Sequence, residues 1–443
     1  MKYCIRTFGC QMNYSDSERM TTVLEKMKYQ KAEDFADSDL VILNTCSIKQ
    51  PSEDRVIGLE KQFRPLRLQN PNLRIGITGC MVRETGIRGQ SNDRLFKQMK
   101  SIDFVFQIKE LMKLPDILHE LHPIESDEEV SDLLSYFHIS PKLTNATQVF
   151  CPIQRGCNNY CSFCIVPYSR GKEVCREMSE MEEEIKKFVK RGASEINLVG
   201  QNVNSYKPTD FDKNSIDSPF AQLLRKIDAI EGVKRIRFYA VHPKDMGDDV
   251  VNLYGELKSM VPHIHLPLQS GSASCLKRMN RRYEPDKFRE LVHKLRARVP
   301  HISISTDIIV GFCGETEAEH QETVDLMKEL KIDLAYISKY SERPGTLAQR
   351  SLKDDVSLET KKRRFREMTD VIRDISNDYH QQFVGQTKEV LVEKVEKGYA
   401  SGKIPEFKLT RFESDDKELI GKYVPVTITE ALDWCLEAKL SIS

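Results

Sequence analysis

The chain has 443 residues, a length that favours about three domains of ~150 residues each. Lysine plus arginine number 67 and aspartate plus glutamate also number 67, so overall charge neither supports nor excludes a nucleic-acid partner. An RNA site would have to be a local patch. No apolar run approaches the ~18 residues of a membrane-spanning helix, so we expect a soluble globular protein with no membrane partner.

The first residues, Met1–Arg6, lead directly into a strand-like segment and lack the basic region and long apolar stretch of an export signal. We therefore expect a cytoplasmic location. Twelve cysteines could form six disulfides in a secreted protein, but thiols stay reduced in the cytosol. The sequence therefore favours metal ligation for most of these cysteines.

Residues 1–116 alternate strand and helix signals, which is typical of an α/β domain with a parallel sheet. A capping pair, Ser15 with Glu18, predicts the start of a helix that runs to Lys28. The short apolar segments of this region predict strands at 3–8, 40–44 and 74–78.

A cysteine follows each of these strands, namely Cys10, Cys46 and Cys80. Because the carboxyl ends of parallel strands lie on one edge of a sheet, the three thiols can converge there. Gly9 and Gly79 beside them would let the backbone turn tightly next to a bulky ligand. Three converging thiolates suggest an iron–sulfur cluster, but taken alone the pattern favours small buried cysteines that pack under loops.

Residues 117–145 contain an acidic run and show no sustained periodicity, which predicts a linker. Strand and helix signals alternate again over residues 146–376. They predict an open or partial (β/α)6 barrel, whose active site would lie at the carboxyl ends of the strands. The predicted barrel strands are 149–153, 195–199, 235–239, 263–266, 302–310 and 333–338.

The loop after the first barrel strand carries three cysteines with the spacing C-x3-C-x2-C, which are Cys157, Cys161 and Cys164. Thiolates are soft ligands of iron–sulfur clusters, and such clusters normally take four of them. Three protein thiolates leave one iron of a four-iron four-sulfur (4Fe-4S) cluster open to bind a substrate. The alternatives are a chance grouping or a zinc knuckle that uses Cys151 or Cys175, but zinc sites usually show paired C-x2-C spacings and none is repeated here.

The motif Gly-Cys-Asn-x-x-Cys-x-Phe-Cys-Ile-Val-Pro at 156–167 resembles that of the methylthiotransferase branch of the radical S-adenosylmethionine (SAM) enzymes. The loop Gln-Ser-Gly-Ser at 269–272 looks most like the MiaB type of that branch. The earlier cysteine motifs, Gly-Cys-Gln-Met-Asn, Asn-Thr-Cys-Ser and Thr-Gly-Cys-Met, are similar to those of the family's N-terminal domain. The sequence departs from the family pattern at Gln50–Pro51 and at Val82–Arg83, where a small residue and Gln are usual.

The resemblance implies SAM and two 4Fe-4S clusters as cofactors. One cluster would cleave SAM to a 5′-deoxyadenosyl radical, and the other would hold the sulfur that a second SAM methylates before transfer. The catalytic and metal-ligating residues are then Cys157, Cys161 and Cys164 for the SAM-side cluster and Cys10, Cys46 and Cys80 for the sulfur-side cluster. The expected SAM-binding residues are Phe163, Gly200, Gln201, Asn202, His265, Gln269, Ser305, Asp307 and Arg343. On its own, a single histidine such as His265 is more typical of a hydrogen-bonded core residue.

Residues 377–443 alternate apolar and polar positions between glycine turns, which predicts a small antiparallel β-barrel similar to a TRAM RNA-binding domain. A long helix at 357–382 precedes it and carries the basic run Lys361–Arg364, which could equally be a solvated face. The barrel could also serve packing alone. The candidate RNA contacts are Lys277, Arg278, Arg281, Arg282, Lys403, Lys408, Arg411 and Phe412.

By this resemblance, residues 1–116 form the N-terminal methylthiotransferase domain, 146–376 the radical SAM core and 377–443 the TRAM domain. The implied activity replaces C2–H of N6-isopentenyladenosine 37, in the tRNA anticodon stem-loop, with a methylthio group. We expect a monomer that receives electrons from a donor protein. Alternative substrates are threonylcarbamoyladenosine in tRNA and a ribosomal-protein aspartate. An alternative of another class is an iron–sulfur RNA-binding regulator, which would not cleave SAM.

Overall fold

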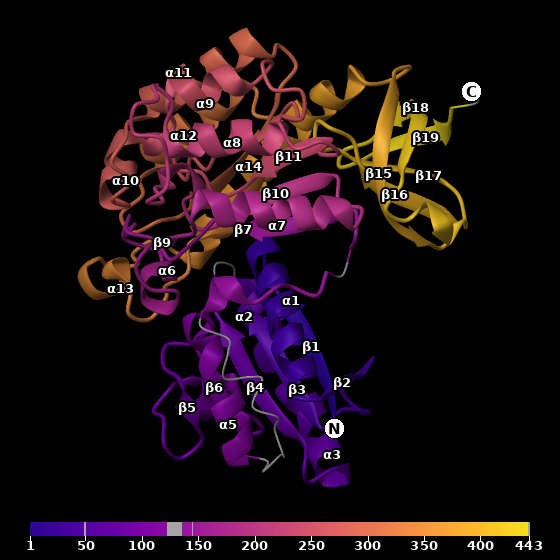
Figure 1. The fold of residues 1–443 in the computed structure, drawn as a ribbon. Coiled ribbons are helices and arrows are strands. Elements are labelled where there is room, and N and C mark those ends of the chain that lie inside the picture. The colour runs from indigo at the N-terminus through magenta and orange to yellow at the C-terminus, as the bar shows by residue number, and fades with distance from the viewer. Residues whose placement is uncertain (48–49, 122–134, 144, 442–443) are drawn as a thin grey trace. The chain divides into compact units, whose positions relative to one another are not determined.

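The computed structural model describes residues 1–47, 50–121, 135–143 and 145–441 (Figure 1). The chain separates into two compact units. The first unit comprises Met1–Thr144, Arg155–Tyr160 and Cys164–Val174, and the second comprises Asn145–Gln154, Cys161–Phe163 and Cys175–Ser443. The second cysteine motif therefore contributes residues to both units.

The first unit is built on a mostly parallel sheet. Its strands are β1 (Lys2–Phe8), β2 (Gln30–Lys31), β3 (Leu40–Thr45), β4 (Arg74–Gly79), β5 (Gly86–Ile87) and β6 (Phe104–Phe106). They lie in the order β2-β1-β3-β4-β6-β5, and among these described strands only β5 pairs antiparallel with its neighbour. The strands predicted at 3–8, 40–44 and 74–78 are confirmed. The sequence does not predict β2, β5 and β6, because two or three residues are too few to show a period.

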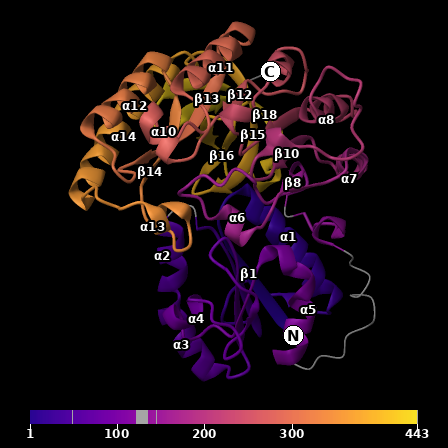
Figure 2. The same cartoon turned by 90° about the vertical axis from the view of Figure 1, so that its left-hand side faces the viewer.

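Helices cover both faces of this sheet. They are α1 (Gln11–Lys26), α2 (Gln50–Gly58), α3 (Glu60–Gln69), α4 (Leu95–Gln98) and α5 (Leu114–Leu121), with a 3-10 helix at Ile108–Lys113. Figure 2 shows α2, α3 and α4 on one side of the sheet and α1 on the other. Val56 of α2 and Phe63 of α3 join one buried apolar cluster with Val41 and Ile75 of the central strands. The sheet is therefore buried on both faces, as parallel sheets usually are.

The prediction that Ser15 caps the first helix is wrong, because α1 begins at Gln11 with Cys10 as its N-cap residue. The backbone nitrogen of Cys10 donates to Asn13 Oδ1 at 3.2 Å. Ser15 lies inside the helix, where its Oγ accepts a hydrogen bond from Arg19 Nη1 at 2.7 Å. The helix thus starts directly at the cysteine that follows β1.

Part of the predicted linker packs on the first unit. Residues 122–134 and 144 lie outside the described residues. A short 3-10 helix, Tyr136–His138, follows in the described part, and its Tyr136 is buried. The Tyr136 hydroxyl donates to Asp16 Oδ1 at 2.6 Å.

The second unit holds a partial barrel of parallel strands. They are β7 (Gln148–Pro152), β10 (Glu195–Val199), β11 (Arg235–Phe238), β12 (His263–His265), β13 (Ser303–Val310) and β14 (Leu334–Lys339). Each agrees with a predicted strand to within one residue at either end. The strands pair in the orders β11-β10-β7 and β12-β13-β14, and an isolated bridge joins Ile236 to Met260. The predicted open or partial barrel is therefore confirmed.

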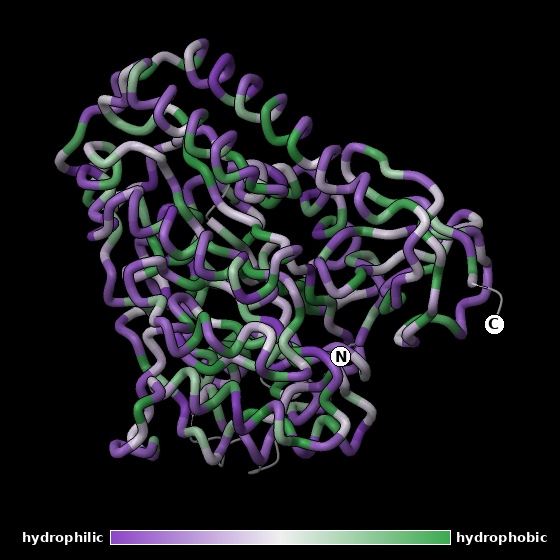
Figure 3. The backbone as a smooth tube through the Cα atoms, turned by 90° about the horizontal axis from the view of Figure 1, so that it is seen from above, coloured by the Kyte–Doolittle hydropathy of each residue, from purple (hydrophilic) through white to green (hydrophobic). Residues whose placement is uncertain are grey.

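The helices of the second unit follow its strands in sequence. They are α7 (Met178–Lys190), α8 (Pro219–Asp228), α9 (Asp248–Leu253), α10 (Ala273–Arg278), α11 (Pro285–Arg298), α12 (Glu317–Leu330), α13 (Leu347–Ser351) and α14 (Leu358–Gln381). Figure 3 shows hydrophilic (purple) and hydrophobic (green) positions mixed along the helical turns of the tube, as in amphipathic helices. Within the described part of the chain, none of the helices is long and apolar enough to cross a membrane. The short strands β8 (Gln154–Arg155) and β9 (Val174–Cys175) flank the second cysteine motif.

The C-terminal segment forms a closed barrel with the strand order β15-β16-β17-β19-β18. Its strands are β15 (Thr387–Glu396), β16 (Tyr399–Lys403), β17 (Leu409–Glu413), β18 (Tyr423–Ala431) and β19 (Leu436–Leu440). The predicted barrel is confirmed, although β17 and β19 pair in parallel rather than antiparallel. Phe412 lies in the barrel core with Val390 and Val426.

The turn between β16 and β17 packs against the amino ends of the partial-barrel strands. Arg237 donates from Nη2 to the carbonyl oxygen of Ile404 at 3.1 Å, and the Phe407 ring stacks on His263 with centroids 4.4 Å apart. Lys408 forms a buried ion pair with Asp333, directly before β14. This turn closes the amino end of the barrel, so the loops at the carboxyl ends are left to build a site.

We expect Lys408→Met to lower the free energy of unfolding by about 3–5 kcal/mol, because it leaves the Asp333 carboxylate buried without its counter-ion. The matched control is Lys403→Met, which should cost about 1 kcal/mol or less because Lys403 and its partner Glu393 are both 30% exposed. Denaturant unfolding followed by circular dichroism measures both variants. Equal losses would contradict the anchoring role of this turn.

Candidate active site

Strands β1, β3 and β4 are neighbours in the sheet, and Cys46 and Cys80 directly follow β3 and β4, whereas Cys10 follows β1 after Gly9. The ladder places Phe8 opposite Thr45 and Thr45 opposite Gly79, so the strands end at the same level. It continues one step further, because Cys46 N donates to Phe8 O and Cys80 N donates to Thr45 O, both at 2.8 Å. The three cysteines therefore lie at the same carboxyl edge, as the sequence predicted. Their role as ligands stays a prediction.

Gly79 shows why the chain can pass so close to its neighbour at this edge. Its φ is +94°, and a Cβ atom added there would lie 2.1 Å from the carbonyl oxygen of Thr45. Only glycine fits both the left-handed backbone and the close approach. The position of Cys80 thus depends on the glycine before it.

A buried arginine contacts the sulfur of Cys80. Arg170 Nε donates to Cys80 Sγ at 3.4 Å, and Arg170 Nη2 forms an ion pair with Asp16 Oδ2 at 2.6 Å. The two charged side chains are only 2% and 0% exposed. Burial lowers the pKa of Arg170, but Asp16 and Cys80 oppose this and the pKa ends well above its usual value. The guanidinium therefore stays charged beside the cysteine.

Arg170 also influences Cys10, which shares the edge with Cys80. Burial of the thiol raises the pKa of Cys10, whereas the positive charge of Arg170 lowers it. Arg83, one of the departures from the family pattern, donates from Nη1 to the carbonyl oxygen of Cys80 at 2.5 Å. Burial, followed by the nearby charge of Arg94, lowers the pKa of Arg83 to about 10. Two buried or partly buried arginines thus lie beside Cys80, one at its sulfur and one at its carbonyl oxygen.

The segment with Cys157 and Cys164 belongs to the same unit as these three cysteines. Helix α6 (Val166–Ser169) starts just after Cys164, and Arg170 is its C-cap residue. Gln107 Nε2 donates to the carbonyl oxygen of Ser169 at 3.4 Å, and Cys157 N donates to the carbonyl oxygen of Gly171 at 3.2 Å. Together with the Arg170–Asp16 pair, these contacts hold the segment around Cys157 and Cys164 within the unit that carries Cys10, Cys46 and Cys80.

Cys161 is positioned by residues of the second unit. Arg281, which is buried, donates from Nη1 to Cys161 Sγ at 3.5 Å and from Nη2 to the carbonyl oxygen of Pro267 at 2.9 Å. Ser162 N donates to the carbonyl oxygen of Met279 at 2.9 Å. The two cysteine motifs thus each have a buried arginine against a sulfur atom.

Phe163 packs in an apolar cluster, with its ring centroid 6.3 Å from that of Phe312. This contact explains an aromatic residue before Cys164 by packing, and a cofactor contact stays a prediction. Arg343 is buried and donates from Nη1 to Ser341 Oγ at 3.2 Å within its own loop.

The structure brings together three of the predicted SAM-binding residues on β12 and β13. His265 Nδ1 is hydrogen-bonded to Ser305 Oγ at 3.0 Å, and His265 Nε2 lies 3.2 Å from Asp307 Oδ2. Gln269 has a φ of +75°, and its backbone nitrogen donates to the carbonyl oxygen of Asp307 at 2.8 Å. These contacts fit the view of His265 as a hydrogen-bonded core residue, and its role towards SAM stays a prediction.

The loop of Gly200, Gln201 and Asn202 is held by Gln154, a residue that the sequence interpretation did not assign to the site. Gln154 Nε2 donates to the carbonyl oxygen of Asn202 at 2.7 Å, and Gln201 N donates to Gln154 Oε1 at 3.3 Å. Asn202 Nδ2 donates to Asp245 Oδ2 at 2.8 Å. Its Oδ1 is buried and has no hydrogen-bond partner among the described residues.

Three segments of the chain match known families. Residues 151–327 match the radical SAM superfamily, residues 2–107 match uncharacterized protein family UPF0004, and residues 381–441 match the TRAM domain. The chain is 38% identical over 445 residues to the tRNA-2-methylthio-N(6)-dimethylallyladenosine synthase of Clostridium tetani, covering 99% of this chain and 96% of that protein. It is 37% identical over 446 residues to the same-named protein of Thermoanaerobacter pseudethanolicus, covering 99% and 92%.

The chain belongs to the radical SAM methylthiotransferase family, MiaB type. It is therefore an enzyme of the transferase class. Among solved structures, it is similar to the radical SAM methyltransferase TsrM from Kitasatospora setae, with a TM-score of 0.56 and 13% identity over 90% of this chain and 78% of that one. It is also similar to the cobalamin-dependent radical enzyme OxsB, with a TM-score of 0.51 and 12% identity over 83% and 56%. At these identities the likeness shows the fold alone.

The radical SAM match implies SAM and a 4Fe-4S cluster, and thiols are the protein ligands of such clusters. Among the described residues, no group of three or more His, Cys, Asp or Glu side chains is already gathered closely enough to hold a metal ion. Each motif nevertheless supplies a thiol donor set, and each is contacted by a buried arginine. Arg170 Nη1 and Arg281 Nε are buried and find no hydrogen-bond partner in the described part of the chain. Such N–H groups suit the anionic sulfur of a cluster, whose potential depends on hydrogen bonds to sulfur.

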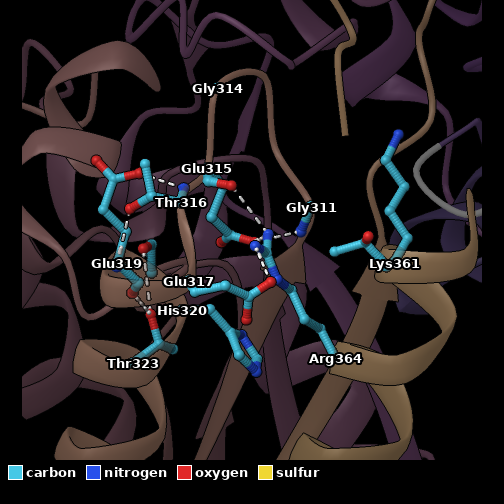
Figure 4. Close-up of polar contacts among 12 residues, drawn as sticks. Gly311, Gly314, Glu315, Thr316, Glu317, Glu319, His320, Thr323, Lys361 and Arg364 are labelled. Carbon is cyan, nitrogen blue, oxygen red and sulfur yellow. Dashed lines mark hydrogen bonds and ion pairs between the residues drawn. The ribbon is translucent and has the colours of Figure 1, made fainter. Parts of the chain in front are cut away.

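The loop that follows β13 in this methylthiotransferase is held to α14 by hydrogen bonds and an ion pair (Figure 4). Glu315 Oε2 accepts hydrogen bonds from Gly311 N at 2.6 Å and from Arg364 Nη1 of α14 at 2.7 Å. Burial raises the pKa of Glu315, and Arg364 opposes that rise. The suggestion that the whole basic run of α14 is a solvated face is wrong, because Arg364 is buried and Lys361 pairs with Asp354.

Two candidate RNA contacts in the C-terminal barrel are wrong, because Lys408 is 4% exposed in its ion pair and Phe412 is 1% exposed in the core. Arg281 is also wrong as a phosphate contact, since it is buried beside Cys161. Arg278 pairs with Glu319 at 2.8 Å. The exposed or partly exposed candidates that stay predictions are Lys277, Arg278, Arg282, Lys403 and Arg411.

Gly79→Ala should disturb the N-terminal cysteine edge, because the new Cβ meets the Thr45 carbonyl oxygen in addition to the strain of a positive φ. Gly89→Ala is the matched control, because its φ of +91° is similar and nothing lies within 4 Å of the new Cβ. We expect Gly79→Ala to lose roughly half of the iron bound after anaerobic reconstitution, while Gly89→Ala keeps it. Iron and sulfide assays measure the difference. The same iron content in both variants would contradict this account of the edge.

Proposed function

We propose that this enzyme methylthiolates C2 of N6-isopentenyladenosine at position 37 of tRNA. The observation that carries the proposal is the 38% identity, over 99% of the chain, to a tRNA-2-methylthio-N(6)-dimethylallyladenosine synthase. The TRAM match at 381–441 supports an RNA substrate. A tRNA substrate places the enzyme in the cytoplasm.

The chemistry explains why a cofactor is needed. The C2–H bond of adenine is not acidic enough for a side-chain base, so acid–base catalysis cannot reach it. When bound, two 4Fe-4S clusters with SAM supply a radical that activates this bond and a sulfur atom that replaces the hydrogen. Reduction of the SAM-side cluster requires an electron-donor protein. The chain's own residues then have to hold, orient and shield these groups.

Cys157, Cys161 and Cys164 would hold the SAM-side cluster. Arg281 would donate to its sulfur atoms, because it already contacts Cys161 and keeps a buried Nε without a partner among the described residues. Asn202 is suited to the amino group of SAM, since its buried Oδ1 is an acceptor with no partner in the described part of the chain. Gln154 fixes the backbone of that loop.

Cys10, Cys46 and Cys80 would hold the second cluster, at the edge to which α6 ties Cys157 and Cys164. The reaction requires adenine C2 to meet both the radical source and the sulfur, so the target base has to leave its stack. The partly exposed basic residues Lys277, Arg282, Lys403 and Arg411 would contact the phosphates of the stem.

The substrate prediction is tested with anaerobically reconstituted enzyme, SAM, a reductant and tRNA that carries isopentenyladenosine. We expect 2-methylthio-isopentenyladenosine in the nucleoside digest and no reaction on unmodified adenosine. Mass spectrometry of the nucleosides measures the product. Product from threonylcarbamoyladenosine tRNA or from the ribosomal protein, but not from isopentenylated tRNA, would contradict the proposal in favour of a related transferase. Binding of tRNA without cleavage of SAM would favour a regulator.

The division of labour between the cysteines predicts different losses. Cys157→Ala should abolish the formation of 5′-deoxyadenosine, because it removes a ligand of the SAM-side cluster. Cys10→Ala should keep that reaction but stop methylthiolation. Chromatography of 5′-deoxyadenosine and of the modified nucleoside measures the two activities separately. Loss of both activities in each folded variant would contradict the separate roles.

A further inference from the structure

Arg170 is fixed by a chain of buried contacts that starts outside both cysteine motifs. The Tyr136 hydroxyl donates to Asp16 Oδ1 at 2.6 Å, and Asp16 Oδ2 accepts from Arg170 Nη2 at 2.6 Å. The next nitrogen of the guanidinium, Nε, donates to Cys80 Sγ at 3.4 Å. Asp16, which itself accepts a hydrogen bond from Tyr136, thus binds one edge of the Arg170 guanidinium, and the same edge contacts Cys80.

The contacts leave donors of two buried or partly buried arginines near Cys80 without a partner among the described residues. Arg170 Nη1 is buried and has no hydrogen-bond partner among the residues described, although the side chain is only 2% exposed. On the carbonyl side of Cys80, Arg83 Nε and Nη2 are likewise buried without a partner in the described residues. Buried N–H donors of charged groups are costly when unpaired. Their presence beside a cysteine set indicates that an anion belongs there.

A purely structural role would account for the ion pair but not for the remaining donor. A lysine or a neutral donor could tie α6 to Asp16 as well, whereas a guanidinium can bind Asp16 and still offer further N–H groups. Arg170 also acts on two of the predicted ligands, since it contacts Cys80 and its charge is felt by Cys10. The anion that completes this environment must lie close to the N-terminal cysteines.

We propose that Arg170, oriented by Asp16 and Tyr136, is the residue that binds the anionic sulfur, of the hydrosulfide class, held at the N-terminal cysteine set before its transfer. This inference rests on the proposed function, because it assigns a residue to the sulfur substrate of the second cluster. Arg83, which donates to the Cys80 carbonyl oxygen, contributes additional positive charge near Cys80. The positive charge of Arg170 also favours the reduced, more negative form of any cluster at this edge.

The test uses the full-length chain with Cys157, Cys161 and Cys164 replaced by Ala, so that only the N-terminal set can hold a cluster. After anaerobic reconstitution we expect about four irons per chain, as in one cluster. Sodium hydrosulfide is titrated into the reduced protein, with sodium chloride as the control anion. The change in the electron paramagnetic resonance (EPR) spectrum gives an apparent dissociation constant, and redox titration gives the midpoint potential.

Arg170→Gln should weaken hydrosulfide binding at least about tenfold and lower the midpoint potential, because a charge-assisted donor is lost. Arg170→Lys should recover part of both effects by keeping the charge. Asp16→Asn should weaken binding in the same direction, because it removes the carboxylate that orients the guanidinium. The matched control is Arg67→Gln, since Arg67 pairs with Asp103 at the amino end of the same sheet. This control should bind hydrosulfide as tightly as the parent, which is the chain with the three alanine replacements and no other change.

An unchanged dissociation constant and potential in Arg170→Gln, with the iron content kept, would overturn the inference and leave the proposed function standing. Equal weakening in Arg170→Gln and Arg67→Gln would also overturn it, because the effect would then be general destabilisation. No response to hydrosulfide in the parent chain would overturn both the inference and the sulfur-delivery role of the N-terminal cysteines.

Discussion

The buried ion pair between Arg170 and Asp16 is the contact on which the arrangement of the cysteines depends. It joins residues 154 positions apart and connects the helix after Cys164 to the helix that starts at Cys10. Buried ion pairs contribute little net stability compared with apolar packing, but removing one partner costs about 3–5 kcal/mol. Such a pair is better suited to fixing one arrangement than to raising stability. Here it connects the segment that carries Cys164 to the helix that follows Cys10, within the first unit.

The rest of the fold leaves that edge available. In the first unit, parallel register ends β1, β3 and β4 at one level, so that their thiols follow at the same edge. In the second unit, the turn of the C-terminal barrel packs on the amino ends of the partial-barrel strands through Phe407 and Lys408. The carboxyl ends then carry the loops with Asn202 and Gln269, as in other barrels whose chemistry lies at that face.

The strands and the edge of cysteines could be predicted from the sequence, because both follow from local patterns. In this chain, an apolar run followed by Gly or Thr and then Cys occurs at the end of each of the three strands. This local pattern can be seen without knowing which strands are neighbours in the sheet. The Tyr136–Asp16–Arg170 chain could not be predicted in this way, because its members are 120 and 154 residues apart. Tyr136 also lies in a stretch whose composition indicates a linker. Only the structure shows that part of that stretch is buried.

Other misses have similarly physical reasons. The prediction that a helix starts at Ser15 is wrong because Cys10 and Asn13 form the cap. Cysteine is not among the usual capping residues, so the sequence did not show it. Lys408 and Phe412 were assigned to RNA because basic and aromatic residues on a small barrel suit nucleic acid. Alternation shows that neighbouring residues face opposite sides, but the side that becomes the core depends on how the barrel closes. Arg281 escaped notice as a partner of Cys161, since the two are 120 residues apart.

The central proposal is that two clusters, one on each set of cysteines, act on the same substrate base. The most direct measurement is the EPR spectrum of the fully reduced enzyme with both clusters, compared with the spectra of two full-length variants that each retain one set. Two clusters that act on one base have to lie close enough to interact magnetically, so the proposal predicts a spectrum that differs from the sum of the two single-cluster spectra. A spectrum equal to that sum, with full iron content in all samples, would contradict it.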